Sequence, residues 1–164
     1  MLTTARSTTK SDAASALLED PRYELMPFDS LGEQLDHLPD GATINITASP
    51  TLDLDATIDW AEKAAGRGYE VVPHIAARYV EDEQHLASIS ERLRDAGITD
   101  IFVPGGDLEE PVGKFDSAYQ LLQALDELEY DFQDVGITGY PEGHGFLSDE
   151  TLAESMAKKA PHAT

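Results

Sequence analysis

Apolar and polar positions along the chain alternate between short strand-like runs and longer helix-like stretches. Short runs rich in Val, Ile and Tyr are typical of strands. Leu86, Ile89 and Leu93 recur at helical spacing and predict one amphipathic helix. The predicted strands are residues 23–28, 42–50, 69–76, 100–107 and 134–141, and the predicted helices are residues 31–38, 54–68, 82–97, 116–129 and 148–160.

Residues suited to helix ends flank two of these helices. Asp53 and Ser148 precede predicted helices, and their side chains can accept hydrogen bonds from the free N–H groups of the first turn. Gly66 or Gly68 is expected to end the helix that begins after Asp53. These signals support the predicted boundaries.

The regular alternation of strands and helices predicts right-handed βαβ units and a parallel sheet. Two architectures fit: an open doubly wound sheet or part of a (β/α)8 barrel. The turn after the first strand reads MPFDSLG and lacks Gly-x-Gly-x-x-Gly, which argues against a dinucleotide fold of the Rossmann kind. A flavodoxin-like sheet stays open. Residues 1–20 are small and polar, so we expect a loose lead-in followed by one domain over residues 21–164.

The net charge of −21, from 32 acidic and 11 basic residues, limits the kinds of partner that this protein is expected to bind. A duplex-binding surface needs a basic patch, and none is visible, so nucleic acid is not an expected partner. The acidic residues could simply form a solvated surface that keeps the protein soluble. Because they are spread over every segment, we favour a halophilic protein whose carboxylates stay hydrated in a high-salt cytoplasm.

The chain contains no cysteine, so neither disulfides nor thiolate chemistry is available to it. No apolar run approaches the roughly 18 residues that a membrane-spanning helix needs. The first residues, MLTTARSTTKSDAASALLED, lack the apolar core of a signal peptide. We therefore expect a soluble cytoplasmic protein without a membrane partner.

Polar side chains gather after several of the predicted strands. The carboxyl ends of parallel strands form the ligand face in both candidate folds, so these side chains predict a site. Glu24 differs because it lies within the first strand, where burying a carboxylate is costly unless the residue serves a purpose. The side chains at strand ends are Thr47, His74, Asp107, Tyr140, Glu142 and His144.

A structural role remains open for each of these residues taken alone. Glu24 could face solvent on an edge strand, and His74 could be a strand-end histidine with satisfied hydrogen bonds. Asp107 could cap the next loop, whereas Gly105 and Gly106 could let a planar ligand approach the backbone closely. No two histidines have the spacing of metal ligands, so no metal site is predicted.

Several motifs together resemble one known family. In chain order they are YELMPF, INITASP, VVPHIAARYV, AGITDIFVPGGD, GITGYPEGHGF and a helix ending in AKK. This set resembles the methylenetetrahydrofolate reductase family, which has a flavin-linked (β/α)8 barrel. The resemblance covers Tyr23 to Thr164 and implies a partial TIM barrel of about five parallel strands with flanking helices.

The resemblance implies an oxidoreductase of one-carbon metabolism that reduces 5,10-methylenetetrahydrofolate to 5-methyltetrahydrofolate, a step toward methionine biosynthesis. NADH or NADPH would reduce FAD, and the reduced flavin would pass a hydride to the folate. By position, Glu24 matches the general acid and Asp107 matches a carboxylate beside the flavin and the pterin. Lys159 matches a basic residue that meets the FAD phosphates. The flavin-contacting positions are matched by Thr47, His74, Gly106, Ala118, Tyr140 and His144.

Three departures indicate a divergent branch of that family. Gly105 stands where an arginine is usual, and Met26-Pro27-Phe28 stands where a stretch like Phe-Pro-Pro is usual. The chain ends at KKAPHAT, where a sixth strand with a Thr-Gln motif would begin. Five strands cannot close an eight-stranded barrel. We therefore expect a fragment, one half of a split barrel or a degenerate relative, with little turnover by these residues alone.

A second class of function follows from the same departures. The chain could be a non-catalytic module that binds a flavin or a pterin. It could also form a homo-oligomer or assemble with a complementary C-terminal half.

Overall fold

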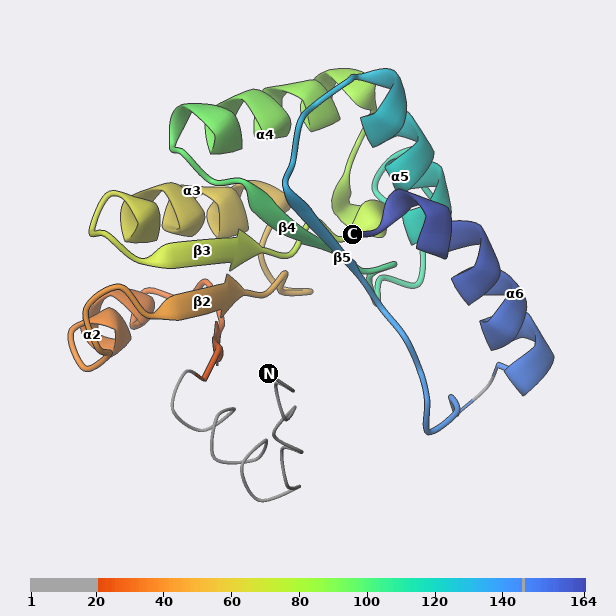
Figure 1. The fold of residues 1–164 in the computed structure, drawn as a ribbon, viewed down its shortest axis with the longest axis horizontal. Helices are drawn as coiled ribbons and strands as arrows, with labels where there is room; N and C mark the ends of the chain where they lie inside the picture. Colours follow the sequence, from red (N-terminus) through yellow and green to blue (C-terminus); the bar gives the residue numbers. More distant parts are fainter. Residues whose placement is uncertain (1–20, 146) are drawn as a thin grey trace, which may run out of the picture.

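A computed structural model of the chain describes residues 21–145 and 147–164 and has an α/β fold with parallel strands (Figure 1). This confirms the predicted α/β class with parallel strands. The predicted lead-in over residues 1–20 lies outside the described residues. The strands are β1 (Tyr23–Leu25), β2 (Thr43–Ile46), β3 (Glu70–Pro73), β4 (Asp100–Val103) and β5 (Asp134–Ile137). The α-helices are α2 (Leu31–Leu35), α3 (Leu54–Ala65), α4 (Glu83–Asp95), α5 (Ala118–Glu127) and α6 (Asp149–Lys159), and the 3₁₀ turns are η1 (Ala77–Tyr79) and η2 (Ala160–His162).

Every predicted strand and helix is present, but the strands are shorter than the apolar runs that predicted them. The run over residues 100–107, for example, pairs as a strand only to Val103, and Pro104 then removes a backbone donor. Two predicted helix caps are confirmed. The side chains of Asp53 and Ser148 accept hydrogen bonds from the first turns of α3 and α6.

The strands pair with their neighbours in the chain. β1 pairs with β2, β2 pairs with β3, and β4 pairs with β5, all in parallel. In a flavodoxin-like sheet, β1 would lie between β2 and β3. Since β1 instead lies beside β2 alone among the described strands, that alternative is wrong for the described residues.

The strands form two small sheets joined by a single bridge between His74 and Phe102. The backbone N–H of His74 donates to the carbonyl of Ile46 in β2, at 2.9 Å. The next N–H, that of Ile75, donates to the carbonyl of Phe102 in β4, at 2.8 Å. Backbone hydrogen bonding with β4 therefore begins only after β3 has ended, which brings the loops that follow β3 and β4 together.

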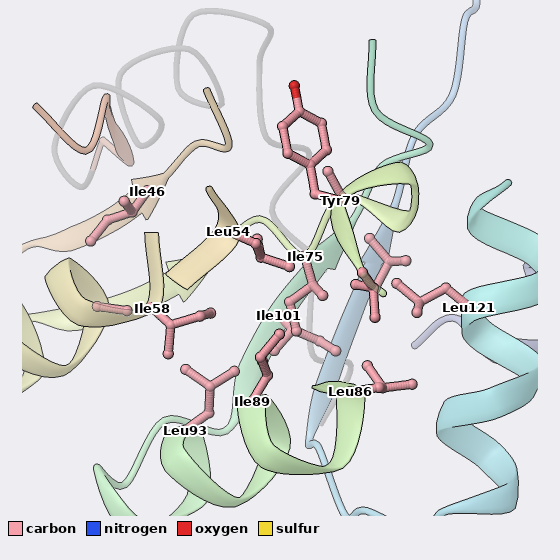
Figure 2. Packing of buried hydrophobic residues seen from close by; sticks show 14 of the residues in the cluster. Ile46, Leu54, Ile58, Ile75, Tyr79, Leu86, Ile89, Leu93, Ile101 and Leu121 are labelled. Atoms are coloured by element: carbon pink, nitrogen blue, oxygen red, sulfur yellow. The ribbon is translucent and has the colours of Figure 1, made fainter. Parts of the chain in front are cut away.

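One hydrophobic core lies between the strands and the helices. Helices α3, α4, α5 and α6 follow one another around the outside of the strands (Figure 1). The buried side chains of β2 and β4 point toward these helices and meet their apolar faces (Figure 2). None of the described helices is long and apolar enough to cross a lipid bilayer. Side chains at the centre of this core include Ile44, Ile46, Ile58, Leu86, Ile89, Leu93, Ile101, Val103 and Leu121.

The other face of the strands points away from these helices. In β1, Leu25 packs against the core, so the alternation of side chains puts Glu24 on the opposite face. Glu24 is in register with Asn45 of β2 and Val72 of β3. His74 follows Val72 by two residues and therefore shares this inner face. The inner face is where the carboxyl ends of the strands form a cleft.

Candidate functional site

A cleft of about 740 Å³ lies at the carboxyl ends of the strands. Its lining comes from the segments that follow β2, β3, β4 and β5. The volume falls within the roughly 300–1,000 Å³ typical of small-molecule sites. Five residues predicted from the sequence lie together in it: His74, Gly106, Asp107, Tyr140 and His144.

His74 is partly buried against the aromatic ring of Phe102, with ring centroids 4.7 Å apart. Burial lowers the pKa of His74 below its ordinary value, and the negative charge of Glu24 partly opposes this. The imidazole is therefore neutral at neutral pH, with one nitrogen able to donate and the other able to accept a hydrogen bond. The influence of Glu24 agrees with its position on the same face of the strands.

The low pKa of His74 predicts how stability depends on pH. As the pH falls through the ordinary histidine value of about 6.5, the unfolded chain takes up this proton before the folded chain does. The contribution of His74 is therefore fully present above that pH and declines below it. We expect His74→Gln to lose less unfolding free energy than the wild type between pH 7.5 and pH 5.5 in urea titrations. The exposed His37→Gln should leave the wild-type pH dependence unchanged, and equal losses in all three proteins would contradict the prediction.

Asp107 is held by a tyrosine that the sequence analysis did not single out. The hydroxyl of Tyr79 donates to Oδ1 of Asp107 at 2.8 Å. Burial of Tyr79 and its hydrogen bond to Asp107 raise the pKa of the phenol to about 12, so it stays a donor. Figure 2 shows the Tyr79 hydroxyl pointing away from the aliphatic side chains of the core. Among the described residues this is the hydrogen bond that Asp107 makes, rather than a cap of the following loop.

Gly106 makes room for this tyrosine. Its φ is 90°, in the left-handed region that disfavours side chains. A Cβ atom at Gly106 would lie 3.2 Å from the ring of Tyr79 and 3.4 Å from Cβ of Ala76. The glycine therefore serves both the backbone conformation and the close approach of Tyr79.

Tyr140 and His144 face each other across the turn that follows β5. Their ring centroids are 5.1 Å apart, with the planes at 80°. The turn is closed by the N–H of Gly143, which donates to the carbonyl of Tyr140 at 3.0 Å. Tyr140 is 44% exposed and presents an aromatic surface to the cleft. Glu142 lines a separate hollow beside α6.

Glu24 and Thr47 lie next to the cleft and do not line it. Glu24 is exposed on β1, which is the edge strand of its described sheet. Thr47 is tied to the backbone, since its N–H donates to the carbonyl of Leu25 at 3.0 Å. The carbonyl of Thr47 accepts from the hydroxyl of Thr57 in α3, and Ala48 takes the adjoining place in the cleft wall.

Ala118 and Lys159 lie outside the cleft lining. Ala118 is the first residue of α5 and is 5% exposed within the core. Lys159 is also 5% exposed, and its Nζ donates to the carbonyl of Thr138 at 2.7 Å. Burial lowers the pKa of Lys159. In this structure Lys159 anchors the end of β5, and Thr138 in turn lines the cleft.

Phe102 and Thr138 belong to the cleft although the sequence analysis did not propose them. Phe102 is in register with Gly136, where a Cβ atom would lie 2.7 Å from the Phe102 ring. Oγ1 of Thr138 and Oδ1 of Asn45 are buried, and neither has a hydrogen-bond partner among the described residues. Strand alternation could have placed Phe102 and Asn45 on the inner face. No local signal distinguishes Thr138.

Comparison of the chain with protein-family models found no match.

Proposed function

We propose that this protein is a methylenetetrahydrofolate reductase-like oxidoreductase built on a partial (β/α)8 barrel. It would reduce 5,10-methylenetetrahydrofolate with NADH or NADPH through FAD. The observation that carries the proposal is the cleft in which His74, Gly106, Asp107, Tyr140 and His144 lie together. These residues come from three separate strand ends and match positions that the family resemblance implies.

The residues of the cleft fit a flavin ring. Phe102 and Tyr140 offer aromatic surface, and Gly105 lacks a side chain where the backbone borders the cleft. The unpaired hydroxyl oxygen of Thr138 and the neutral imidazole of His74 could bond the polar edge of such a ring. A bound FAD would supply hydride transfer between the nicotinamide and the folate.

Two acidic residues would donate a proton and orient the ligand in this reaction. Glu24 would donate a proton from its carboxyl group to the folate, which makes the carbon that receives the hydride more electrophilic. Asp107, with Oδ1 held by Tyr79, would orient polar atoms of the ligand with its other carboxylate oxygen. A fixed orientation matters because small misplacements of the reacting groups strongly lower the reaction rate.

The test measures binding first and turnover second. Titration of the purified protein with FAD should shift the flavin absorbance bands and quench flavin fluorescence. Oxidation of NADH or NADPH should then depend on added 5,10-methylenetetrahydrofolate. Absence of both flavin binding and folate-dependent oxidation would overturn the proposal.

A second candidate function is flavin or pterin binding without turnover. The position of Glu24 favours it, because this carboxylate is exposed and lies outside the cleft lining. Flavin binding without any folate-dependent oxidation would select this candidate over the reductase.

A further inference from the structure

The cleft contains a cationic side chain that forms no ion pair with any acidic residue in the described part of the chain. Arg78 lies on η1, in the segment that follows β3, and lines the cleft beside Gly105 and Asp107. Among the described residues, none forms a hydrogen bond or an ion pair with its guanidinium group. Its Nε is buried and unpaired. The mechanism proposed above assigns no role to this group.

An unpaired arginine is unexpected in so acidic a chain. With 32 acidic and 11 basic residues, carboxylates are abundant. Arg67, Arg92 and Arg94 each pair with at least one carboxylate, whereas Arg22, which also forms no ion pair within the described residues, is exposed to solvent. Burying part of a charged group without a partner is costly, so an arginine kept in this state indicates that its partner is a ligand.

The backbone around Arg78 is fixed on both sides. Its N–H donates to the carbonyl of Gly105 at 3.0 Å, and its carbonyl accepts from the N–H of Val112 at 2.9 Å. The neighbouring carboxylate of Asp107 accepts from Tyr79 and forms no ion pair with Arg78 within the described residues. The guanidinium thus lies at the cleft wall, and its terminal nitrogens form no hydrogen bond with the described residues.

We propose that Arg78 is the anion-binding residue of the cleft and that it takes an oxyanion of the bound ligand, a phosphate or a carboxylate. Guanidinium groups bind both oxyanions through paired, charge-assisted hydrogen bonds. The anion site rests on the geometry of Arg78 alone. The identity of the ligand rests on the proposed function, under which the oxyanion is the phosphate of a flavin nucleotide or the carboxylate of a folate.

The experiment compares ligands that differ in the oxyanion. FMN is paired with riboflavin, which lacks the phosphate, and tetrahydrofolate is paired with 6-methyltetrahydropterin, which lacks the p-aminobenzoyl group and the glutamate. A charge-assisted hydrogen bond to an oxyanion predicts that the wild type binds one charged member about 10- to 100-fold more tightly than its neutral partner. Arg78→Gln should lower that ratio by most of this factor, and Arg78→Lys should keep part of it.

Arg94→Gln is the matched control, because it removes an arginine charge outside the cleft and should leave both ratios unchanged. If Arg78→Gln loses the preference for FMN over riboflavin, the bound oxyanion is a phosphate. If it loses the preference for tetrahydrofolate over 6-methyltetrahydropterin, the bound oxyanion is a carboxylate. Unchanged ratios in Arg78→Gln, in a variant whose circular dichroism matches the wild type, would overturn the proposal.

Inorganic phosphate separates this inference from the proposed function. If neither flavins nor pterins bind the wild type, the proposed function fails. Thermal stabilisation by phosphate that is present in the wild type and Arg94→Gln, and lost in Arg78→Gln, would still support the anion site. Equal stabilisation of all three proteins, or none of the wild type, would overturn it in that case.

Discussion

Glu24→Gln is expected to slow folate reduction by about 100-fold or more while flavin reduction by the nicotinamide continues. A positioned general acid typically contributes about 10²- to 10⁴-fold. Glutamine keeps the size of the side chain but cannot donate the proton. Because Glu24 lies outside the cleft lining, flavin binding should change little.

Two half-reactions on one preparation measure this effect. Nicotinamide oxidation with an artificial electron acceptor reports on flavin reduction, and the appearance of 5-methyltetrahydrofolate reports on the second step. The control is Glu33→Gln, which removes a carboxylate from an exposed position on α2. If folate reduction is unchanged in Glu24→Gln, the general acid lies elsewhere.

Gly106→Val is expected to lower the free energy of unfolding by about 3 kcal/mol. A side chain in the left-handed region costs about 1–2 kcal/mol, and overpacking typically adds about 1–3 kcal/mol. Both apply at Gly106, with its φ of 90° and a ring carbon of Tyr79 at 3.2 Å from the new Cβ. Since Tyr79 must move, the hydrogen bond to Asp107 should also be lost.

Urea unfolding of Gly106→Val and of Gly105→Val provides the comparison. Gly105 is the neighbouring cleft residue, but a Cβ atom there would have no other atom within 4 Å and its backbone is not left-handed. We expect Gly105→Val to remain close to the wild type in stability. Similar losses in the two variants would show that the Tyr79 contact does not matter.

Much of the candidate site could be predicted because the carboxyl ends of parallel strands form the ligand face of such folds. His74, Asp107, Tyr140 and His144 each lie in the segment that follows a strand, and parallel strands bring their carboxyl ends to one side. No knowledge of distant contacts is needed for that step. The same reasoning could not separate these residues from Thr47. Thr47 also follows a strand, but its backbone is hydrogen-bonded to β1 and α3.

The partners within the site could not be predicted in the same way. Tyr79 and Asp107 are 28 positions apart in the chain. They meet because the loops after β3 and β4 converge at the bridge between His74 and Phe102. Lys159 was matched by the family resemblance to a residue that meets the FAD phosphates, and only the packing of α6 turns it toward the carbonyl of Thr138.

The sequence by itself determined the order and type of the elements, the caps at Asp53 and Ser148, and the strand ends at which polar side chains gather. These features depend on local periodicity and on bonds within one turn of chain. The tertiary structure alone decided the pairing order of the strands, the bond between Tyr79 and Asp107, and the unpaired state of Arg78. Those features depend on contacts between segments that are distant in the chain and on the burial of side chains at those contacts. No local pattern in the sequence encodes either of these.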